Sequence, residues 1–220
     1  MCGRVNVSDN EGVRLLLESM GMDTWQPRDP RYNIAPTQTL DVVRSDLTLE
    51  AMSWGVSLTL PGKNGMVTKR IQNSRDDKLW SSRLWKPLIE SQRVLVPVNG
   101  FYEWKRVNKK LVSAFYITSA NSAAMFFAGI FKNPKDQLLK PEVSIITTSA
   151  NESMSEVHDR MPVILNSHNA AMAWLQDSDK SSLTELMAPA SNDTLKFTEV
   201  SSYVNKSSNE GPECSEPMVI

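Results

Sequence analysis

The clearest indication of fold class comes from residues 93–107, which read RVLVPVNGFYEWKRV. After Arg93, residues 94–98 form an apolar run that contains three valines, and residues 101–105 alternate between two faces, as residues of a strand do. A plausible turn follows at residues 107–109. The same pattern returns in three more segments, at residues 113–118, 124–131 and 143–148. Strands therefore dominate the middle of the chain.

Shorter elements are expected on both sides of these strands. Ser8-Asp9-Asn10-Glu11 is a capping-box pattern and predicts a helix that stops at Gly21, preceded by a short strand. We expect a loop at 31–36 and a hairpin from 38–44 and 47–54. Further helices are expected at 77–91, interrupted at Pro87, and near 151–157, 168–176 and 181–187, before a last strand near 195–200. Because strands do not alternate regularly with long helices, the pattern favours an α+β fold with a largely antiparallel sheet.

Composition limits the class of protein. A chain of 220 residues with 40% hydrophobic content suits one domain or a compact pair. No apolar run approaches the ~20 residues of a membrane span, and the N-terminus does not resemble a secretory signal, so we expect a cytoplasmic protein without a membrane partner. Cys2 and Cys214, the latter in a polar tail, argue against a disulfide framework. The two cysteines and the two histidines, His158 and His168, are not spaced closely in sequence as metal ligands usually are, so no metal site is expected.

The charge is unevenly distributed along the chain. Net charge is −1, but residues 63–110 hold twelve Lys and Arg against four Asp and Glu, a balance of +8, which leaves −9 for the remainder. Such a segment can form a local phosphate-binding surface on a protein that is not basic overall. It can equally be a solvated face, and charge alone does not decide between the two.

The N-terminus carries the most reactive pattern, Met1-Cys2-Gly3-Arg4. Removal of Met1 would leave an amine and a thiol on neighbouring carbons, at ordinary pKa values of ~7.7–8.0 and ~8.5. The amine can condense with an aldehyde to an imine, and the thiol can then close a five-membered ring. Cys2 can also be a buried strand residue. Class II glutamine amidotransferases begin with a similar Met-Cys-Gly and use the thiol to attack an amide, so an N-terminal-nucleophile amidohydrolase is the alternative.

Three other stretches carry candidate site residues. Strand alternation places Glu103 on one face with Phe101 and Lys105, where a partly desolvated carboxylate could shuttle protons; a solvent-facing carboxylate is the other interpretation. His158, before an apolar extended run, is a candidate acid or base near pH 7, whereas we assign no role to His168. Asn73-Ser74-Arg75 lies at a strand-to-helix junction, where it could orient reacting groups and grip phosphate, or simply cap the helix.

Five blocks, in this order and spacing, resemble the SOS response-associated peptidase (SRAP) family. They are Met1-Cys2-Gly3-Arg4, Tyr32-Asn33-Ile34-Ala35-Pro36, Asn73-Ser74-Arg75, Gly100-Phe101-Tyr102-Glu103-Trp104-Lys105 and His158-Asp159-Arg160-Met161-Pro162. The resemblance implies a single domain over residues 1–205 with a curved or barrel-like sheet flanked by helices, and a polar tail over 206–220. It also implies a monomer that needs no cofactor and joins itself covalently to abasic sites in single-stranded DNA during the DNA damage (SOS) response.

The resemblance also implies roles for individual residues. Cys2 would form a thiazolidine with the ring-opened sugar, Glu103 would shuttle protons, His158 would assist sugar-ring opening and Asn73 would hold the reacting groups. Removal of Met1 by the protein itself and a lyase-like activity would accompany this chemistry. Phosphates would be bound by four arginines, Arg4, Arg75, Arg83 and Arg160. DNA binding should then weaken with salt and show little base preference.

Two departures from the family pattern concern DNA contacts. Asp77 stands where many relatives have Glu, and its role is open. A tryptophan-rich loop of the family is represented only by Trp54-Gly55, with Leu58 and Leu60 where further aromatics would be expected. Either leucine could act as an apolar wedge in place of base stacking.

Overall fold

The computed structural model describes residues 2–23, 26–63, 65–134, 136 and 138–218. Five strands form a closed ring in the order β12, β4, β3, β8, β11, because β11 also pairs with β12. Only the β12–β4 contact within this ring is parallel. The ring strands are β3 (Thr39–Val43), β4 (Leu49–Trp54), β8 (Arg93–Val98), β11 (Met125–Lys132) and β12 (Glu142–Ser149). The α+β class and the barrel-like, largely antiparallel sheet are thus confirmed.

Strand β8 shows why residues 94–98 are apolar without alternation. Val94, Val96 and Val98 pack into the cluster inside the barrel, whereas Leu95 packs into a second cluster beneath the helices. Both faces of the strand are covered, so neither face selects polar residues. The second cluster is closed by Trp174, whose indole N–H donates to the Val94 carbonyl at 3.0 Å.

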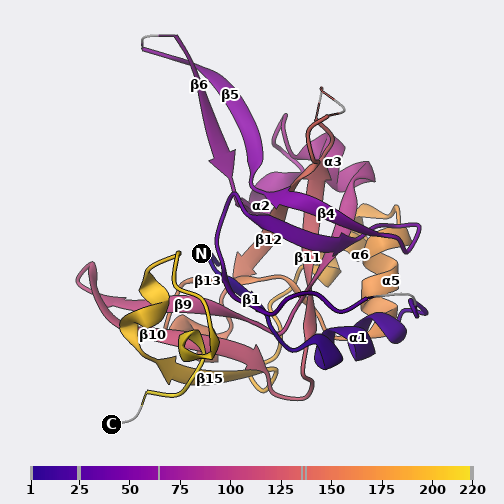
Figure 1. Ribbon diagram of the computed structural model, residues 1–220. Helices are drawn as coiled ribbons and strands as arrows, with labels where there is room; N and C mark the ends of the chain where they lie inside the picture. The colour runs from indigo at the N-terminus through magenta and orange to yellow at the C-terminus, as the bar shows by residue number, and fades with distance from the viewer. Residues whose placement is uncertain (1, 24–25, 64, 135, 137, 219–220) are drawn as a thin grey trace.

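Helices cover the outside of the barrel. Figure 1 shows α1 (Asn10–Glu18), α5 (His168–Gln176) and α6 (Lys180–Leu186) on one side of it, while α2 (Asp76–Leu79) and α3 (Lys86–Ser91) lie near its upper end. None of the helices in the described residues is long and apolar enough to cross a membrane. The short α4 (Glu152–Ser155) precedes two brief strands that extend the barrel sheet, β13 (Arg160–Pro162) and β14 (Ile164–Leu165).

A second sheet lies against the barrel, with its strands in the order β15, β10, β9, β1, β2. Its inner face meets the barrel core where Phe101 packs edge-on against Phe127, with ring centroids 5.5 Å apart. Its outer face holds Tyr102 beneath the C-terminal 3-10 turns η1 (Ser202–Asn205) and η2 (Pro212–Cys214). The strands are β1 (Val5–Val7), β2 (Arg31–Ile34), β9 (Gly100–Val107), β10 (Lys110–Ser119) and β15 (Leu195–Val200).

Three local expectations were wrong. Residues 31–34 form β2 rather than a loop, because β1 supplies a pairing partner, with Val5 opposite Ile34. The helix expected at 77–91 is two short helices, and Pro87 lies in the first turn of α3, where its missing N–H costs no intrahelical bond. Asp9 rather than Ser8 caps α1, accepting from the Gly12 N–H at 3.1 Å.

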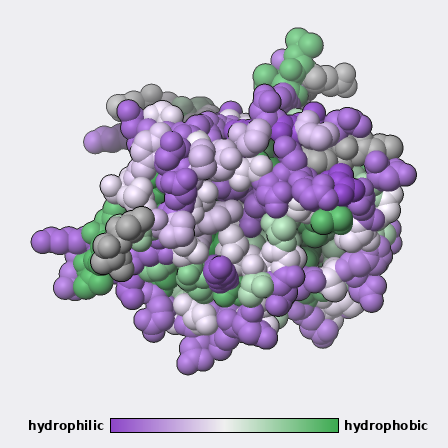
Figure 2. All heavy atoms as spheres, turned by 60° about the horizontal axis from the view of Figure 1, so that its bottom comes forward, coloured by the Kyte–Doolittle hydropathy of each residue, from purple (hydrophilic) through white to green (hydrophobic). Residues whose placement is uncertain are grey.

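A hairpin that the sequence analysis did not predict projects from the top of the molecule in Figure 1. It consists of β5 (Val56–Gly62) and β6 (Gly65–Ile71). It carries Lys63, Lys69 and Arg70 of the basic segment. The face of the molecule in Figure 2 is mostly hydrophilic, with its hydrophobic side chains in small groups. Part of the excess positive charge of residues 63–110 therefore lies on the solvated surface of this hairpin.

The C-terminal residues pack against the second sheet. Cys214, expected in a polar tail, is fully buried beside Tyr102 and Val204. Pro217 forms a bridge with Val200, and the Met218 N–H donates to the Glu199 carbonyl at 2.9 Å. Polar composition did not indicate this packing, because few apolar side chains of the segment make the contact.

Candidate functional site around Cys2

Cys2 lies immediately before β1, between the barrel and the second sheet. Its side chain is fully buried in the main core cluster, and its Sγ lies 3.9 Å from the Arg4 carbonyl oxygen. Asn73, the first residue of β7 (Asn73–Arg75), donates its side-chain N–H to the Cys2 carbonyl at 2.7 Å. Strand β7 holds Asn73 there by pairing with β12, where Asn73 lies opposite Ile145.

Glu103 is the acidic group next to Cys2. It lies on β9, is 3% exposed and shares its side of the strand with the buried Phe101, as strand alternation predicted. Burial raises the pKa of the Cys2 thiol, and the negative charge of Glu103 raises it further. The ordinary thiol pKa expected from the sequence therefore does not hold in this chain, and the sulfur is protonated at neutral pH.

Asn73 has an unused acceptor beside this cysteine. Its Oδ1 is buried and has no hydrogen-bond partner among the described residues. A buried amide oxygen without a donor is costly, so its retention is typical of a functional position. Asn73 can accept from a donor at the chain start while its N–H fixes the Cys2 carbonyl.

His158 follows α4 and has two alternative partners for one ring nitrogen. Its Nδ1 lies 3.0 Å from the Arg160 backbone N–H and 2.8 Å from Asp159 Oδ1. An unprotonated Nδ1 accepts from the backbone N–H, whereas a protonated Nδ1 donates to Asp159. Nδ1 therefore has a partner whether or not it carries the proton, and this fixes the orientation of the ring.

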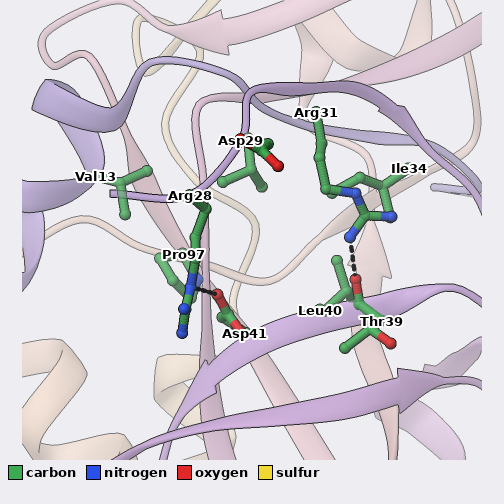
Figure 3. Close-up of a pocket in the computed structure, with 10 residues that line it drawn as sticks. Val13, Arg28, Asp29, Arg31, Ile34, Thr39, Leu40, Asp41 and Pro97 are labelled. Carbon is green, nitrogen blue, oxygen red and sulfur yellow. Dashed lines mark hydrogen bonds and ion pairs between the residues drawn. The ribbon is translucent and has the colours of Figure 1, made fainter. Parts of the chain in front are cut away.

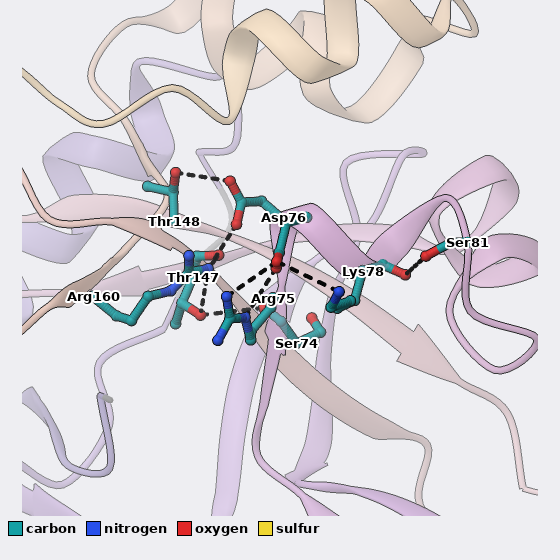
Figure 4. A network of polar contacts seen from close by, with 9 residues as sticks. Ser74, Arg75, Asp76, Lys78, Ser81, Thr147, Thr148 and Arg160 are labelled. Atoms are coloured by element: carbon teal, nitrogen blue, oxygen red, sulfur yellow. Dashed lines mark hydrogen bonds and ion pairs between the residues drawn. The ribbon is translucent and has the colours of Figure 1, made fainter.

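Arg160 is held by protein groups. Its Nη2 donates to Asp76 Oδ1 at 2.6 Å and to the Thr147 carbonyl oxygen (Figure 4). The guanidinium side chain is 11% exposed. The sequence analysis assigned Arg160 to phosphate, but the pairing with Asp76 makes it an internal ion pair in the free protein.

Arg4 likewise contacts protein. Its Nη1 donates to Asn33 Oδ1 and to the Val204 carbonyl, both at 2.9 Å, and its guanidinium lies over the Trp104 ring at 5.6 Å. Burial lowers the pKa of Arg4. Arg4 and the buried Asn33 thus together hold the C-terminal segment against the second sheet. Sequence reasoning gave Asn33 no role, and only its place in the Tyr32–Pro36 block marked it.

Arg75 and Arg83 are the two exposed members of the predicted phosphate set. Arg75 forms a two-bonded pair with Asp77, with Nε to Oδ1 at 2.9 Å and Nη2 to Oδ2 at 3.0 Å. The pair raises the pKa of Arg75 and lowers that of Asp77. Asp77, whose role the sequence left open, is thus the partner of Arg75.

Trp54 does not offer a stacking surface. Its side chain is fully buried in the barrel core, and the indole N–H donates to the Gln72 carbonyl at 3.0 Å. On the hairpin that follows, Leu60 is exposed and Leu58 half-buried. On this side of the molecule, the accessible apolar side chains are thus those of the hairpin and not that of the tryptophan.

One cavity lies apart from these residues. It measures about 260 Å³ and has an apolar floor that includes Val13, Leu40 and Pro97 (Figure 3). At its rim, Arg28 Nε donates to Asp41 Oδ2 at 3.1 Å. None of the predicted site residues is among the described residues that line it. Within the described ranges, no cluster of three or more His, Cys, Asp or Glu side chains could hold a metal ion.

Comparisons with known proteins identify the family of the chain. A family model described as SOS response associated peptidase (SRAP) matches residues 1–207. The chain is 31% identical to the abasic site processing protein YoqW of Bacillus subtilis (98% of this chain, 99% of that one). It is 29% identical to YedK of Escherichia coli (99% and 100%) and 28% identical to HMCES of Rattus norvegicus (95% and 70%), both also named abasic site processing proteins.

The fold is shared with a solved structure as well. A crystal structure of a protein from Bacteroides thetaiotaomicron superposes with a TM-score of 0.79 at 18% identity, covering 99% of this chain and 100% of that one. The family match spans nearly the whole chain and includes all five sequence blocks, and the relatives agree over similar lengths. The chain therefore belongs to the SOS response associated peptidase family.

Proposed function

We propose that this chain is an abasic-site processing protein that links itself covalently to abasic sites in single-stranded DNA through Cys2. The observation that carries the proposal is the buried polar pair around Cys2. Asn73 bonds the Cys2 carbonyl at 2.7 Å and Glu103 lies near the thiol, in an otherwise apolar core. A merely structural cysteine would not require two buried polar side chains beside it.

The proposed reaction begins with removal of Met1, which frees the Cys2 amine. That amine attacks the aldehyde carbon of the ring-opened sugar, and the carbinolamine loses water to give an imine. The thiol sulfur then adds to the imine carbon, and its proton goes to the nitrogen, which closes the thiazolidine. The net reaction releases one water, and no oxidant or reductant is needed.

Each neighbouring side chain has a defined part in these steps. Glu103 takes a proton from the ammonium group and returns it when water leaves. Asn73 keeps the chain start oriented through the Cys2 carbonyl. His158 donates a proton from Nε2 to the sugar ring oxygen during opening, while its Nδ1–H stays bonded to Asp159 Oδ1. Because burial keeps the thiol protonated, ring closure depends on proton transfer within this group.

Binding of the DNA backbone falls to exposed cations. Arg75 and Arg83 are solvent-exposed, and Arg75 lies two residues from Asn73 on the same strand. Phosphate contacts of this kind position a strand without reading its bases. Arg4 and Arg160 can join them only by leaving Asn33 and Asp76 respectively.

Intact mass and an adduct assay test the proposal. The purified protein should have lost Met1 and should form a denaturant-resistant adduct with single-stranded DNA that carries one abasic site. Cys2→Ala should abolish the stable adduct but retain an imine that borohydride traps, because its amine remains. Cys214→Ala is the matched control, since it removes the other buried thiol, and should form the adduct normally.

Two results would overturn the proposal. An undiminished stable adduct in Cys2→Ala would exclude ring closure through sulfur, and absence of any adduct in the wild type would exclude the reaction. Ammonia release from glutamine that depends on Cys2, without an adduct, would favour the amidohydrolase alternative. Whether the protein removes Met1 itself is tested by expression of Glu103→Gln and Asn73→Ala, which should retain Met1 if these residues assist the cleavage.

A further inference from the structure

Two consecutive carboxylates at the start of α2 each neutralise one arginine near Cys2. Asp77 binds Arg75 through two bonds of 2.9 and 3.0 Å. Asp76 accepts from Arg160 Nη2 at 2.6 Å and from the Thr148 hydroxyl at 3.0 Å. Figure 4 shows Arg75, Asp76 and Arg160 gathered at the junction where β7 enters α2. One helical turn thus supplies the counterions of two cations.

Both ion pairs lie at the strand ends that hold the candidate site. Arg75 is opposite Thr147 in the β7–β12 pairing, and the Arg160 guanidinium donates to the carbonyl of the same Thr147. Asn73, which bonds the Cys2 carbonyl, lies two residues before Arg75 on β7. Arg75 therefore lies two residues along β7 from the side chain that bonds the Cys2 carbonyl, and Arg160 is bonded to the strand beside it.

A carboxylate and a phosphate use the same edge of a guanidinium. Both accept two parallel N–H bonds from the planar fork, so an arginine engaged on Nε and Nη2 by Asp77 has to open that pair before it binds a phosphate through the same atoms. Arg160 retains a buried Nε without an acceptor among the described residues, although its Nη2 is fully engaged. Its guanidinium thus has unused donor capacity beside Asp76.

We propose that Asp76 and Asp77 act as intramolecular competitors of DNA phosphates, and that they weaken binding to undamaged single-stranded DNA. The inference rests on the proposed function of the same site. Undamaged nucleotides far outnumber abasic sites, and a protein that binds any phosphate backbone tightly would stay on them. Weak reversible binding lets the protein leave intact DNA, whereas the covalent bond of Cys2 retains it at an abasic site.

The two competitors differ in strength. The Arg75–Asp77 pair is exposed at 52% and 44%, so opening it costs about two- to fivefold in affinity. The Arg160–Asp76 pair is exposed at only 11% and 25%. Removal of the Asp76 charge leaves a buried guanidinium that lacks a counterion, which favours binding of an external anion more strongly. The effect of Asp76 should therefore exceed that of Asp77.

Reversible binding of an intact oligonucleotide tests the inference. The probe is fluorescent oligothymidylate without abasic sites, and its dissociation constant is measured by anisotropy at several salt concentrations. Asp77→Asn should bind about two- to fivefold more tightly at low salt. The slope of log affinity against log salt should steepen by about 0.7 for each additional phosphate that the variant neutralises. Asp76→Asn should give a larger increase.

The exposed Asp193, which lies outside the candidate site, provides the matched control. Asp193→Asn changes the net charge by the same amount and should leave affinity and salt slope at the wild-type values. If Asp77→Asn does no more than this control, or weakens binding, the competition is refuted. Thermal unfolding identifies any folding defect in Asp76→Asn. If there is one, the test depends on Asp77→Asn alone, because Asp77 is exposed and its substitution should not affect folding.

The same measurements separate this inference from the proposed function. A wild type that forms the abasic-site adduct, together with an Asp77→Asn variant that binds like wild type, overturns the competition alone. A wild type that forms no adduct overturns the proposed function, whatever the variants do with intact DNA.

Discussion

Replacing Asn33 by alanine should destabilise the protein by about 3–5 kcal/mol. The side chain is fully buried where β2 meets the C-terminal segment. Its Nδ2 faces three backbone carbonyls, those of Val204 at 3.3 Å, Lys206 at 3.1 Å and Asn209 at 2.9 Å. Its Oδ1 accepts from Arg4 Nη1 at 2.9 Å.

The expected loss of stability depends on how many hydrogen bonds the Asn33 amide can form, not on how many carbonyls lie within reach. An amide nitrogen has two N–H groups, so the three carbonyls share two bonds of about 1 kcal/mol each. The bond from Arg4 has a charged donor and contributes about 1.5–3 kcal/mol. A domain is stable by only about 5–15 kcal/mol, so the loss is a large fraction of the total. For a chain of this length it corresponds to about 6–20 °C in Tm.

Urea unfolding followed by circular dichroism measures this change directly. The control is Asn166→Ala, an exposed asparagine whose removal should change stability by less than about 0.5 kcal/mol. Hydrogen exchange should in addition show faster exchange in residues 202–214 of Asn33→Ala. A loss below about 1 kcal/mol, with normal protection of that segment, would refute the anchoring role that we derive for Asn33 and Arg4.

Three further outcomes are expected. Iodoacetamide should label neither Cys2 nor Cys214 in the native protein at pH 7.5 but both in urea, as intact mass would reveal, because both side chains are buried and burial raises the pKa of both thiols. Rapid native labelling of Cys2 would contradict its burial. Burial raises the pKa of Cys214 to about 11, against about 8.5 for a free thiol. The contribution of this thiol to stability is therefore present below pH 8.5 and is lost as the pH rises toward 11. The urea midpoint of Cys214→Ala should decline less over that pH range than the midpoint of the wild type. Trp54→Phe should cost about 0.5–1.5 kcal/mol in urea unfolding, because the Gln72 carbonyl loses one of its two donors and keeps the Ile145 N–H at 3.0 Å. DNA binding in the anisotropy assay should not weaken; weaker binding at unchanged stability would instead point to stacking.

Features that depend on near neighbours in sequence were predictable. The strands at 93–98 and 143–148, the hairpin from 38–44 and 47–54, and the helix at 168–176 all appear close to their expected bounds. The turn at 107–109 is likewise present, with φ of 50° at Asn108 and 66° at Lys109. Alternation, caps and turn residues act within a few positions, so the sequence alone was sufficient for them.

Elements without a clear local burial pattern were misjudged. Residues 31–34 lack a strong strand pattern and become β2 only because β1 lies beside them. The β5–β6 hairpin escaped notice because its exposed residues obey no burial pattern. Cys214 looked like part of a solvated tail, yet the second sheet has an outer apolar face that this segment covers.

The sequence by itself determined the α+β class and the succession of the main strands along the chain, and it named Cys2 and its neighbours as the candidate site. Only the tertiary structure decided how those residues are used. Arg4 meets Val204 across 200 positions, and Arg160 meets Asp76 across 84. The distance between two charged side chains is set by pairings between strands that are far apart in sequence. Strand β12, for example, pairs with both β7 and β13 and so brings Asp76 and Arg160 together, a contact that local patterns do not encode.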